Sequence, residues 1–232
     1  MSASVLPAIE PTMLPVAGGG LYPVRRVYCV GRNYLDHIRE MKEGDERDPP
    51  FFFQKPPDAV VADGTVIAYP PDTADFQFEV ELVVALGRGG RNIVVRDALG
   101  CVYGYAVGID LTRRDRQRDM RAKMLPWERG KAFDASVPCS LIHPAANVGH
   151  PVQGAITLAV NGVERQRGDL SQMIWNVPEI IANLSASYRL MPGDLIMTGT
   201  PAGVGALVPG DQVVAVVEGV GELTVAIGPQ EV

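Results

Sequence analysis

One stretch constrains the fold most: residues 76–87, FQFEVELVVALG, rich in the β-branched and aromatic residues typical of a strand. Successive side chains of a strand point to opposite faces, so Glu79 and Glu81 are predicted to share one face. Because unpaired charges are costly to bury, two such carboxylates in an apolar strand call for a nearby metal ion, lysine or arginine. The alternative is that both glutamates lie on a solvated face, and the pattern taken alone favours this alternative.

Short strand patterns separated by glycine and proline turns recur along the chain. Residues 155–168 read as a hairpin with a type I′ turn at Asn161-Gly162, and residues 212–227 read as a closing hairpin. The clearest amphipathic helix covers residues 176–190. These patterns predict a mixed, mostly β fold with few helices.

The domain organisation follows from the turn residues and the absence of a later linker. Residues 1–24 are rich in proline and glycine and are expected to form an N-terminal arm, with a short strand near residues 14–16. Residues 25–232 are expected to form a single catalytic domain.

A short helix pattern, YLDHIREM at residues 34–41, carries the first candidate for acid–base chemistry. His37 and Glu40 stand three residues apart, which places them on one helical face and within hydrogen-bonding reach. A carboxylate that holds an imidazole allows the histidine to accept a proton from water. An exposed helix with a fortuitous pair is the alternative. The charged segment 42–50 that follows has the composition of a mobile lid loop.

A third acid, Asp110, ends the predicted strand GCVYGYAVGID. Thr112 and Asp115 resemble a capping box that opens a helix, and Arg114 and Gln117 then lie on the same face as Asp110. An acid beside a guanidinium and an amide suits a site for a metal and an oxygen-rich ligand. Alternatively, Arg114 pairs with Asp110 on the surface.

Two isolated lysines have a similar ambiguity. Lys55 precedes a proline at the end of FFFQK, and Lys131 lies in the irregular segment 125–138. Lys55 could meet an anionic substrate, although a lysine in either position is normally solvated.

The composition excludes several kinds of partner. A net charge of −6 argues against nucleic acid and anionic membranes. No apolar run approaches the ~20 residues that cross a bilayer. Three widely spaced cysteines and no recognisable secretory leader predict reduced thiols and a cytoplasmic location.

Together, several motifs resemble the fumarylacetoacetate hydrolase family over nearly the whole chain from residue 24. The motifs are CVGRNY (29–34), EVEL (79–82), DLTRRD (110–115), GKAFD (130–134) and GDLIMTGTPAGVG (193–205). The resemblance implies a β-roll or sandwich-like fold of the type found in the family's C-terminal domain, usually as a homodimer. It also implies that a divalent cation is held by Glu79, Glu81 and Asp110. Carboxylate ligands favour Mg²⁺ or Mn²⁺ over zinc.

The resemblance further implies a role for each remaining candidate. In the short acylpyruvase-like members, the residues that match His37 and Glu40 activate water, and the lysine that matches Lys131 stabilises developing negative charge. The matching substrate-binding residues are Arg114, Gln117 and Thr200. The implied reaction is hydrolysis of the carbon–carbon bond of a small 2,4-dioxo acid, an acylpyruvate.

Within the family, PPFFFQKP, GYAVGID and MIWNVPEII are most similar to bacterial members that hydrolyse fumarylpyruvate in gentisate breakdown. A dicarboxylate substrate needs a second cation for its far end, and Arg32 and Lys55 flank the predicted lid loop. The chain departs from many relatives at Phe78, where they carry histidine or tyrosine, which leaves any contact to the metal ligands from this position open.

Two rival functions have different requirements. A decarboxylase or tautomerase of oxaloacetate-like acids would use the same scaffold, but some such reactions need no activated water and hence no His37–Glu40 pair. A non-catalytic binding protein would have no use for this pair and Lys131 beside three metal-binding carboxylates.

Overall fold

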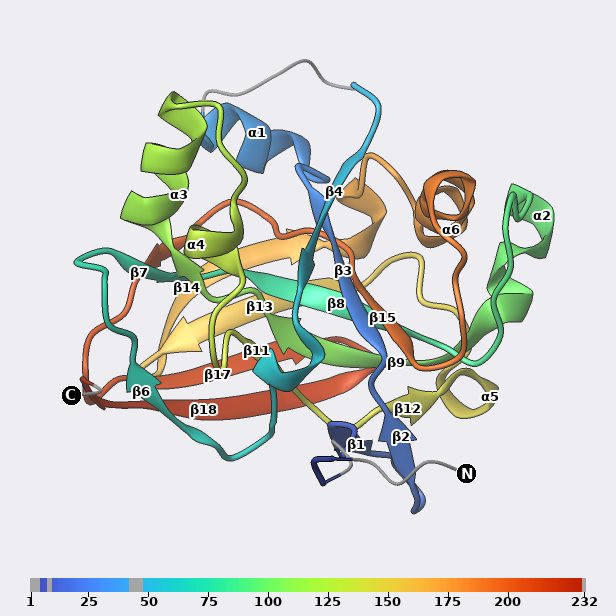
Figure 1. The fold of residues 1–232 in the computed structure, drawn as a ribbon, viewed down its shortest axis with the longest axis horizontal. Coiled ribbons are helices and arrows are strands. Elements are labelled where there is room, and N and C mark those ends of the chain that lie inside the picture. The colour runs from blue at the N-terminus through green and yellow to red at the C-terminus, as the bar shows by residue number, and fades with distance from the viewer. Residues whose placement is uncertain (1–4, 8–9, 42–47, 231–232) are drawn as a thin grey trace.

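The strand of Glu81 lies in the middle of a curled, mixed sheet of eight strands (Figure 1). The computed structural model describes residues 5–7, 10–41 and 48–230. The order in this sheet is β4 (Phe51–Lys55), β3 (Arg26–Gly31), β15 (Asp194–Met197), β8 (Val80–Leu86), β9 (Val102–Ile109), β11 (Val137–Cys139) and β5 (Val60–Ala62), with β12 (His143–Pro144) also paired to β9.

A second sheet of five strands packs against one face of the first. Its order is β14 (Val163–Asp169), β13 (Ala155–Val160), β17 (Gln212–Val217), β18 (Gly221–Gln230) and β6 (Val66–Tyr69). Leu82 and Val84 of β8 share one buried cluster with Leu158, Ala215 and Leu223 of this sheet. The main core therefore lies between the sheets, which confirms the mostly β, sandwich-like prediction.

The opposite face of the eight-stranded sheet has two parts. One part is covered by a hairpin of β1 (Met13–Pro15) and β2 (Leu21–Pro23), with Leu14 and Tyr22 in a second buried cluster that includes Val83. The Tyr22 hydroxyl donates to the backbone oxygens of Leu86 and Asp194 at 2.9 and 3.0 Å. The other part of this face carries the acidic side chains described below.

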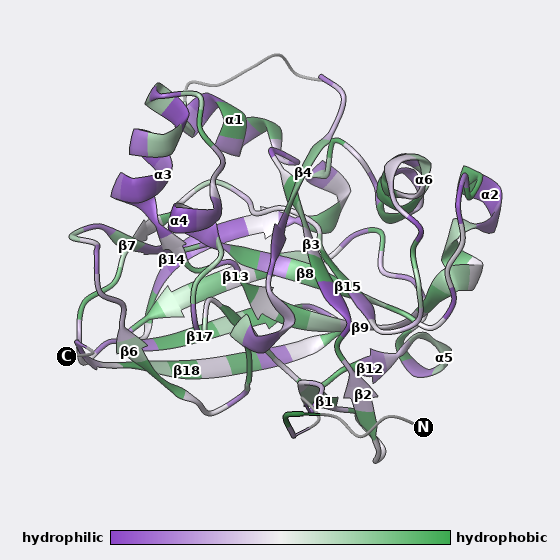
Figure 2. Ribbon diagram, in the orientation of Figure 1, coloured by the Kyte–Doolittle hydropathy of each residue, from purple (hydrophilic) through white to green (hydrophobic). Residues whose placement is uncertain are grey.

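Short helices surround the sheets (Figure 1). Those near β4 are α1 (Leu35–Met41), α3 (Arg114–Ala122) and α4 (Glu128–Lys131), and Figure 2 shows that α3 is strongly hydrophilic. The remaining helices are α2 (Val95–Ala98), α5 (Ala145–Val148), α6 (Val177–Ser187) and the 3₁₀ turns η1 (Pro57–Ala59), η2 (Leu99–Cys101) and η3 (Leu170–Gln172). The described helices are all too short or too polar to cross a lipid bilayer.

Two local predictions are confirmed. Asn161 and Gly162 have φ values of 52° and 76° between β13 and β14, as a type I′ turn requires. Helix α6 begins with a capping box in which Asn176 and Glu179 bond reciprocally, although it ends at Ser187, before the predicted residue 190.

The single strand predicted for residues 76–87 is wrong in one respect. It divides into β7 (Phe76–Phe78) and β8, with Glu79 in neither. Strand β7 leaves the large sheet and pairs instead with β10 (Thr112–Arg113) and β16 (Gly205–Ala206). The interruption occurs where the backbone passes from one sheet to the other.

The capping box predicted at Thr112 and Asp115 is also wrong, because both side chains bond to other groups. The Thr112 hydroxyl donates to the backbone oxygen of Asp110 at 3.0 Å. The Asp115 carboxylate accepts from the Thr73 hydroxyl and the Ala74 amide. Helix α3 therefore begins without a side-chain cap at Arg113.

Candidate active site

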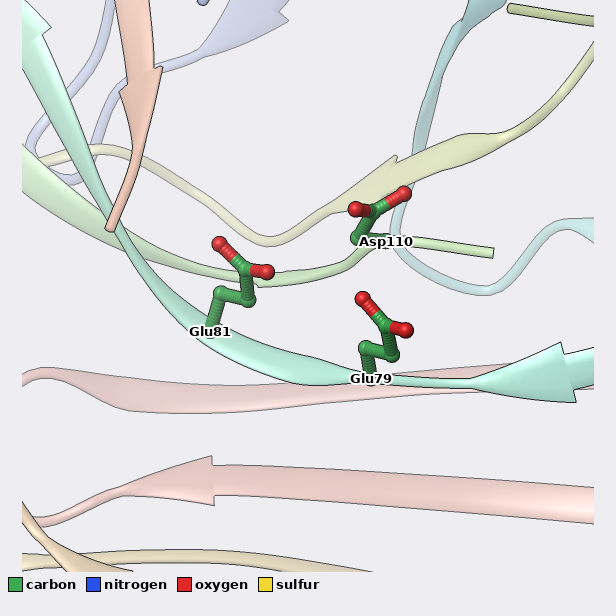
Figure 3. A group of neighbouring side chains, drawn as sticks. All are labelled: Glu79, Glu81 and Asp110. Carbon is green, nitrogen blue, oxygen red and sulfur yellow. The ribbon is translucent and has the colours of Figure 1, made fainter. Parts of the chain in front are cut away.

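Three buried carboxylates meet on the part of the large sheet that the β1–β2 hairpin does not cover. Glu79, Glu81 and Asp110 are 5%, 2% and 1% exposed, and one oxygen of each lies within 4.8 Å of the others. Figure 3 shows that the three carboxylates face a common space, with the two glutamates on one segment and Asp110 on another. The solvated alternative for the glutamates is therefore wrong.

Strand register explains this meeting. Glu81 pairs with Gly108 across β8 and β9, and the Asp110 amide donates to the backbone oxygen of Glu79 at 2.8 Å. Side chains alternate along both strands, so residues 79 and 81 share a face with residues 108 and 110. Gly108 lies opposite Glu81, and a Cβ atom there would lie 2.6 Å from Cγ2 of Val83, so glycine permits this close packing.

Two buried cations lie among these acids. Lys131 Nζ donates to Glu79 Oε2 at 2.8 Å, to Asp110 Oδ2 at 2.6 Å and to Thr112 Oγ1 at 2.7 Å. Arg114 Nη2 donates to Glu79 Oε1. All three protons of the ammonium group thus go to protein oxygens, so Lys131 acts on a neighbouring ligand through its charge. Arg114 pairs with Glu79 instead of with Asp110 on the surface, and Lys131 ends helix α4 instead of lying in a solvated loop.

Lys55 is placed differently from both predictions. It is 2% exposed, so it is not solvated, and it does not line the cavity that contains the acids. Its ammonium group donates to the backbone oxygens of Leu111 and Ser136 at 2.8 and 3.0 Å and lies 2.7 Å from Asp110 Oδ1. Lys55 therefore pairs with Asp110 without lining the cavity. The assignment of Lys55 to the far end of a substrate is wrong.

Replacing Lys55 with methionine is therefore expected to destabilise the fold by about 3–5 kcal/mol, because it removes one partner of a buried ion pair. The free energy of unfolding from urea titrations would measure this loss. Lys123→Met, at an exposed position after α3, is the matched control and should change stability little. An unchanged stability in Lys55→Met, combined with altered substrate preference, would contradict this assignment.

The electrostatics of the acids are asymmetric. Burial alone would raise the pKa of Glu79, but the charges of Lys131 and Arg114 hold it well below its usual range. Burial raises the pKa of Glu81 well above its usual range, and the charges of Asp110 and Glu79 raise it further. The Glu81 side of the cluster thus lacks positive charge.

The triad fits a hard divalent cation. Its donors are all carboxylate oxygens, the ligands that Mg²⁺ and Mn²⁺ accept. Asp110 Oδ1 is buried and has the Lys55 ammonium 2.7 Å away. A cation would supply the positive charge missing near Glu81.

Helices α3 and α4 pack closely, and this packing sets the positions of Arg114, Gln117 and Lys131. A Cβ atom at Gly130 would lie 2.7 Å from the backbone nitrogen of Gln117, so glycine permits this approach. Arg114 Nη1 donates to Gln117 Oε1 at 2.6 Å. This bond occupies the amide oxygen of Gln117, which lines the cavity, and leaves its NH₂ group as the donor toward a ligand.

His37 and Glu40 form the pair predicted on helix α1. His37 Nδ1 lies 3.1 Å from Glu40 Oε2, and the Gly203 amide also donates to the Glu40 carboxylate at 3.1 Å. Burial by itself would raise the pKa of Glu40, but hydrogen bonds from His37 and Gly203 lower it. The ionised carboxylate accepts the Nδ1 proton, which leaves Nε2 of His37, a cavity-lining residue, able to accept a proton.

The loop after β15 connects several of these groups. The Gly199 amide donates to Glu81 Oε2 at 2.7 Å, and Thr200, the next residue, lines the cavity. Gly199 has a φ of +96°, and a Cβ atom there would lie 2.7 Å from Cβ of Asn33. Both observations require glycine at this position.

A cavity of about 150 Å³ lies over the acids. Arg32 lines it, with its guanidinium 5.2 Å from the centre of the Phe51 ring. Arg118 and Arg121 of α3 also line it and were not predicted from the sequence. Their helical spacing from Arg114 (i, i+4 and i+7) could have indicated both arginines. The central part of the predicted lid loop, residues 42–47, lies outside the described residues.

Comparison with known proteins gives consistent results. The model of the fumarylacetoacetate (FAA) hydrolase C-terminal family matches residues 26–227. A fumarylpyruvate hydrolase from Ralstonia sp is 47% identical over 181 residues, 78% of this chain and 94% of that protein. The oxaloacetate tautomerase YcgM of Escherichia coli is 40% identical over 199 residues, 85% of this chain and 90% of that protein. The crystal structure of fumarylpyruvate hydrolase from Pseudomonas aeruginosa in complex with Mn²⁺ and pyruvate has a TM-score of 0.96 and 48% identity, covering 98% of this chain and 100% of that chain.

Proposed function

Because the chain belongs to the fumarylacetoacetate hydrolase family, we propose that it is a metal-dependent enzyme that hydrolyses fumarylpyruvate to fumarate and pyruvate. The observation that carries the proposal is a row of polar side chains along α3. Arg114, Gln117, Arg118 and Arg121 share a helical face, and all line the cavity. At 1.5 Å per residue this row extends about 10 Å from the acids.

The length of the row matches a long dicarboxylate. The terminal carboxyl carbons of fumarylpyruvate are six bonds apart, roughly 7–8 Å when extended, whereas those of oxaloacetate are three bonds apart. A ligand with one end at the acids would bring its far carboxylate near Arg118, Arg121 or Arg32. Acetylpyruvate has no charge at that end.

The charges of the site also favour a dianion. The three acids are balanced formally by Lys55, Lys131 and Arg114. A divalent cation on Glu79, Glu81 and Asp110 would add two positive charges and supply Lewis-acid polarisation for the 2-oxo acid end of the substrate. We propose Mn²⁺ or Mg²⁺, since the relative from Pseudomonas aeruginosa was crystallised with Mn²⁺.

The remaining roles belong to this chain's own side chains. Glu40 holds the Nδ1 proton of His37, so that Nε2 takes a proton from water. The resulting hydroxide attacks the carbonyl carbon of the fumaryl group, and the bond from this carbon to the CH₂ group breaks. Pyruvate leaves as its enolate and is then protonated at carbon. Lys131 stabilises this negative charge, while Gln117 and Thr200 donate hydrogen bonds to the substrate.

Steady-state rates on fumarylpyruvate and acetylpyruvate test the substrate assignment. One of Arg32, Arg118 and Arg121 is expected to bind the far carboxylate. Replacing that arginine with alanine should lower kcat/KM for fumarylpyruvate about ten- to hundredfold, because a charge-assisted hydrogen bond is lost. The rate on acetylpyruvate should change little. Arg96→Ala, on the exposed face of α2, is the control.

Two outcomes would redirect the proposal. If acetylpyruvate is the equal or better substrate of the wild type, the enzyme is a general acylpyruvase. If neither compound is cleaved but the keto–enol conversion of oxaloacetate is accelerated, the activity is that of the tautomerase relatives.

The proposal includes two expectations from the sequence that concern the protein in the cell. One is assembly as a homodimer, which analytical ultracentrifugation would test. The other is a cytoplasmic location, which fractionation of the source cells would test.

A further inference from the structure

Gln166 stands out on β14 because it is the buried residue in an exposed run. Residues 163–165 and 167 are exposed, whereas Gln166 is 0% exposed. The register of β13 and β14 shifts beside it, between Leu158 and Ala159. A β-bulge of this kind redirects a side chain. Here the amide is directed inward, toward the loop after β15.

The hydrogen bonds of Gln166 fix which way its amide points. Its Oε1 accepts from the backbone amide of Val80 at 3.0 Å, a group that can only donate. Its Nε2 donates to the backbone oxygen of Pro201 at 2.8 Å, a group that can only accept. These two partners leave one orientation, in which the second Nε2 proton is donated to Thr200 Oγ1 at 2.9 Å.

This orientation determines the role of the Thr200 hydroxyl. Because its oxygen accepts from Gln166, its own proton is available to another acceptor. Within the described part of the chain, no group accepts that proton, and Thr200 is 3% exposed and lines the cavity. The proton is therefore available for a ligand oxygen in the cavity.

We propose that Gln166 is a positioning residue that makes Thr200 a hydrogen-bond donor to the bound 2-oxo acid. The proposal rests on the proposed function for the class of ligand. Val80 separates the two glutamates, and Thr200 follows Gly199, whose amide donates to Glu81. Gln166 thus links the acidic segment and the substrate-contacting loop from outside the cavity.

The most informative variant is Gln166→Glu. The carboxyl group keeps the shape of the side chain and an acceptor for the Val80 amide. It replaces the NH₂ group with an oxygen that accepts the Thr200 proton, so the hydroxyl turns away from the ligand. Pyruvate binding to the Mn²⁺-loaded protein, measured by calorimetry, is expected to weaken about ten- to hundredfold. Mn²⁺ affinity should change much less than pyruvate affinity, because Gln166 bonds to none of the three acidic side chains.

A double-mutant cycle with Thr200→Val separates positioning from a general loss of structure. If Gln166 acts through the hydroxyl, Gln166→Glu should weaken pyruvate binding little further in the Thr200→Val background. Thr200→Ser, which keeps a hydroxyl, should bind pyruvate nearly as the wild type does. If Gln166→Glu does not fold, Gln166→Met takes its place in the same cycle with the same expected non-additivity.

Additive effects in the cycle would overturn the proposal, as would a wild-type pyruvate affinity in Gln166→Glu. A wild type that binds no pyruvate when loaded with Mn²⁺ would also overturn it. Failure of the proposed function looks different: the wild type binds pyruvate and the cycle is non-additive, but fumarylpyruvate is not hydrolysed.

Discussion

Replacing Glu81 with glutamine is expected to abolish metal-dependent hydrolysis, with a loss of about 10³-fold or more in kcat/KM. The amide keeps the size of the side chain and an oxygen that can accept from the Gly199 amide. Its NH₂ group, however, replaces one of the carboxylate oxygens with a donor. Binding of Mn²⁺ should weaken by more than the ten- to hundredfold typical of a residue that only supports a ligand.

The fold of the Glu81→Gln variant should survive. Burial and the neighbouring acids Asp110 and Glu79 already raise the pKa of the Glu81 carboxylate. The substitution removes this carboxylate, so the repulsion among the acids decreases. Thermal unfolding without metal should show a midpoint no lower than that of the wild type. Glu222→Gln, at an exposed position on β18, is the control. Unchanged Mn²⁺ affinity in Glu81→Gln would contradict the assignment of the metal site.

Replacing His37 with alanine is expected to lower kcat for hydrolysis by about 10²- to 10⁴-fold, the usual contribution of a general base. Glu40 and the cavity would remain, but no imidazole Nε2 would take the proton from water. Mn²⁺ and pyruvate should still bind, because His37 contacts neither the acids nor the loop after β15 through any described hydrogen bond.

Asp36→Ala, on the exposed side of the same helix, controls for disturbance of α1. If His37→Ala hydrolyses fumarylpyruvate at nearly the wild-type rate, the pair with Glu40 has a structural role only. Comparable loss in both variants would indicate that the helix as a whole, and not the imidazole, is required.

Alternation along a strand was enough to predict that Glu79 and Glu81 share a face, and burial makes a neighbouring cation necessary. The meeting with Asp110 depends on the register of β8 against β9, which joins segments about thirty residues apart. Local patterns do not determine such a register. The strand-end position of Asp110 and its spacing from Arg114 and Gln117 made it a candidate, but only the resemblance to the family grouped it with Glu79 and Glu81.

The lysines show where local reasoning fails. A lysine before a proline or beside a glycine is usually solvated, yet Lys55 and Lys131 are each 2% exposed. Their burial is possible only because oxygens of distant residues surround each ammonium group. Lys55 has one acid and two backbone oxygens, and Lys131 has two acids and a hydroxyl. No sequence pattern indicated Gln166, because its neighbours in the sequence are polar and exposed. Its inward direction arises from a β-bulge.

The central claim is that the protein adds water across the carbon–carbon bond of fumarylpyruvate. Product analysis by mass spectrometry after incubation with the Mn²⁺-loaded protein in H₂¹⁸O tests it most directly. The expected result is equal amounts of fumarate and pyruvate, with one ¹⁸O atom in the fumarate carboxylate derived from the attacked carbonyl. Recovery of fumarylpyruvate uncleaved, from protein that binds Mn²⁺ and accelerates the tautomerisation of oxaloacetate, would contradict it.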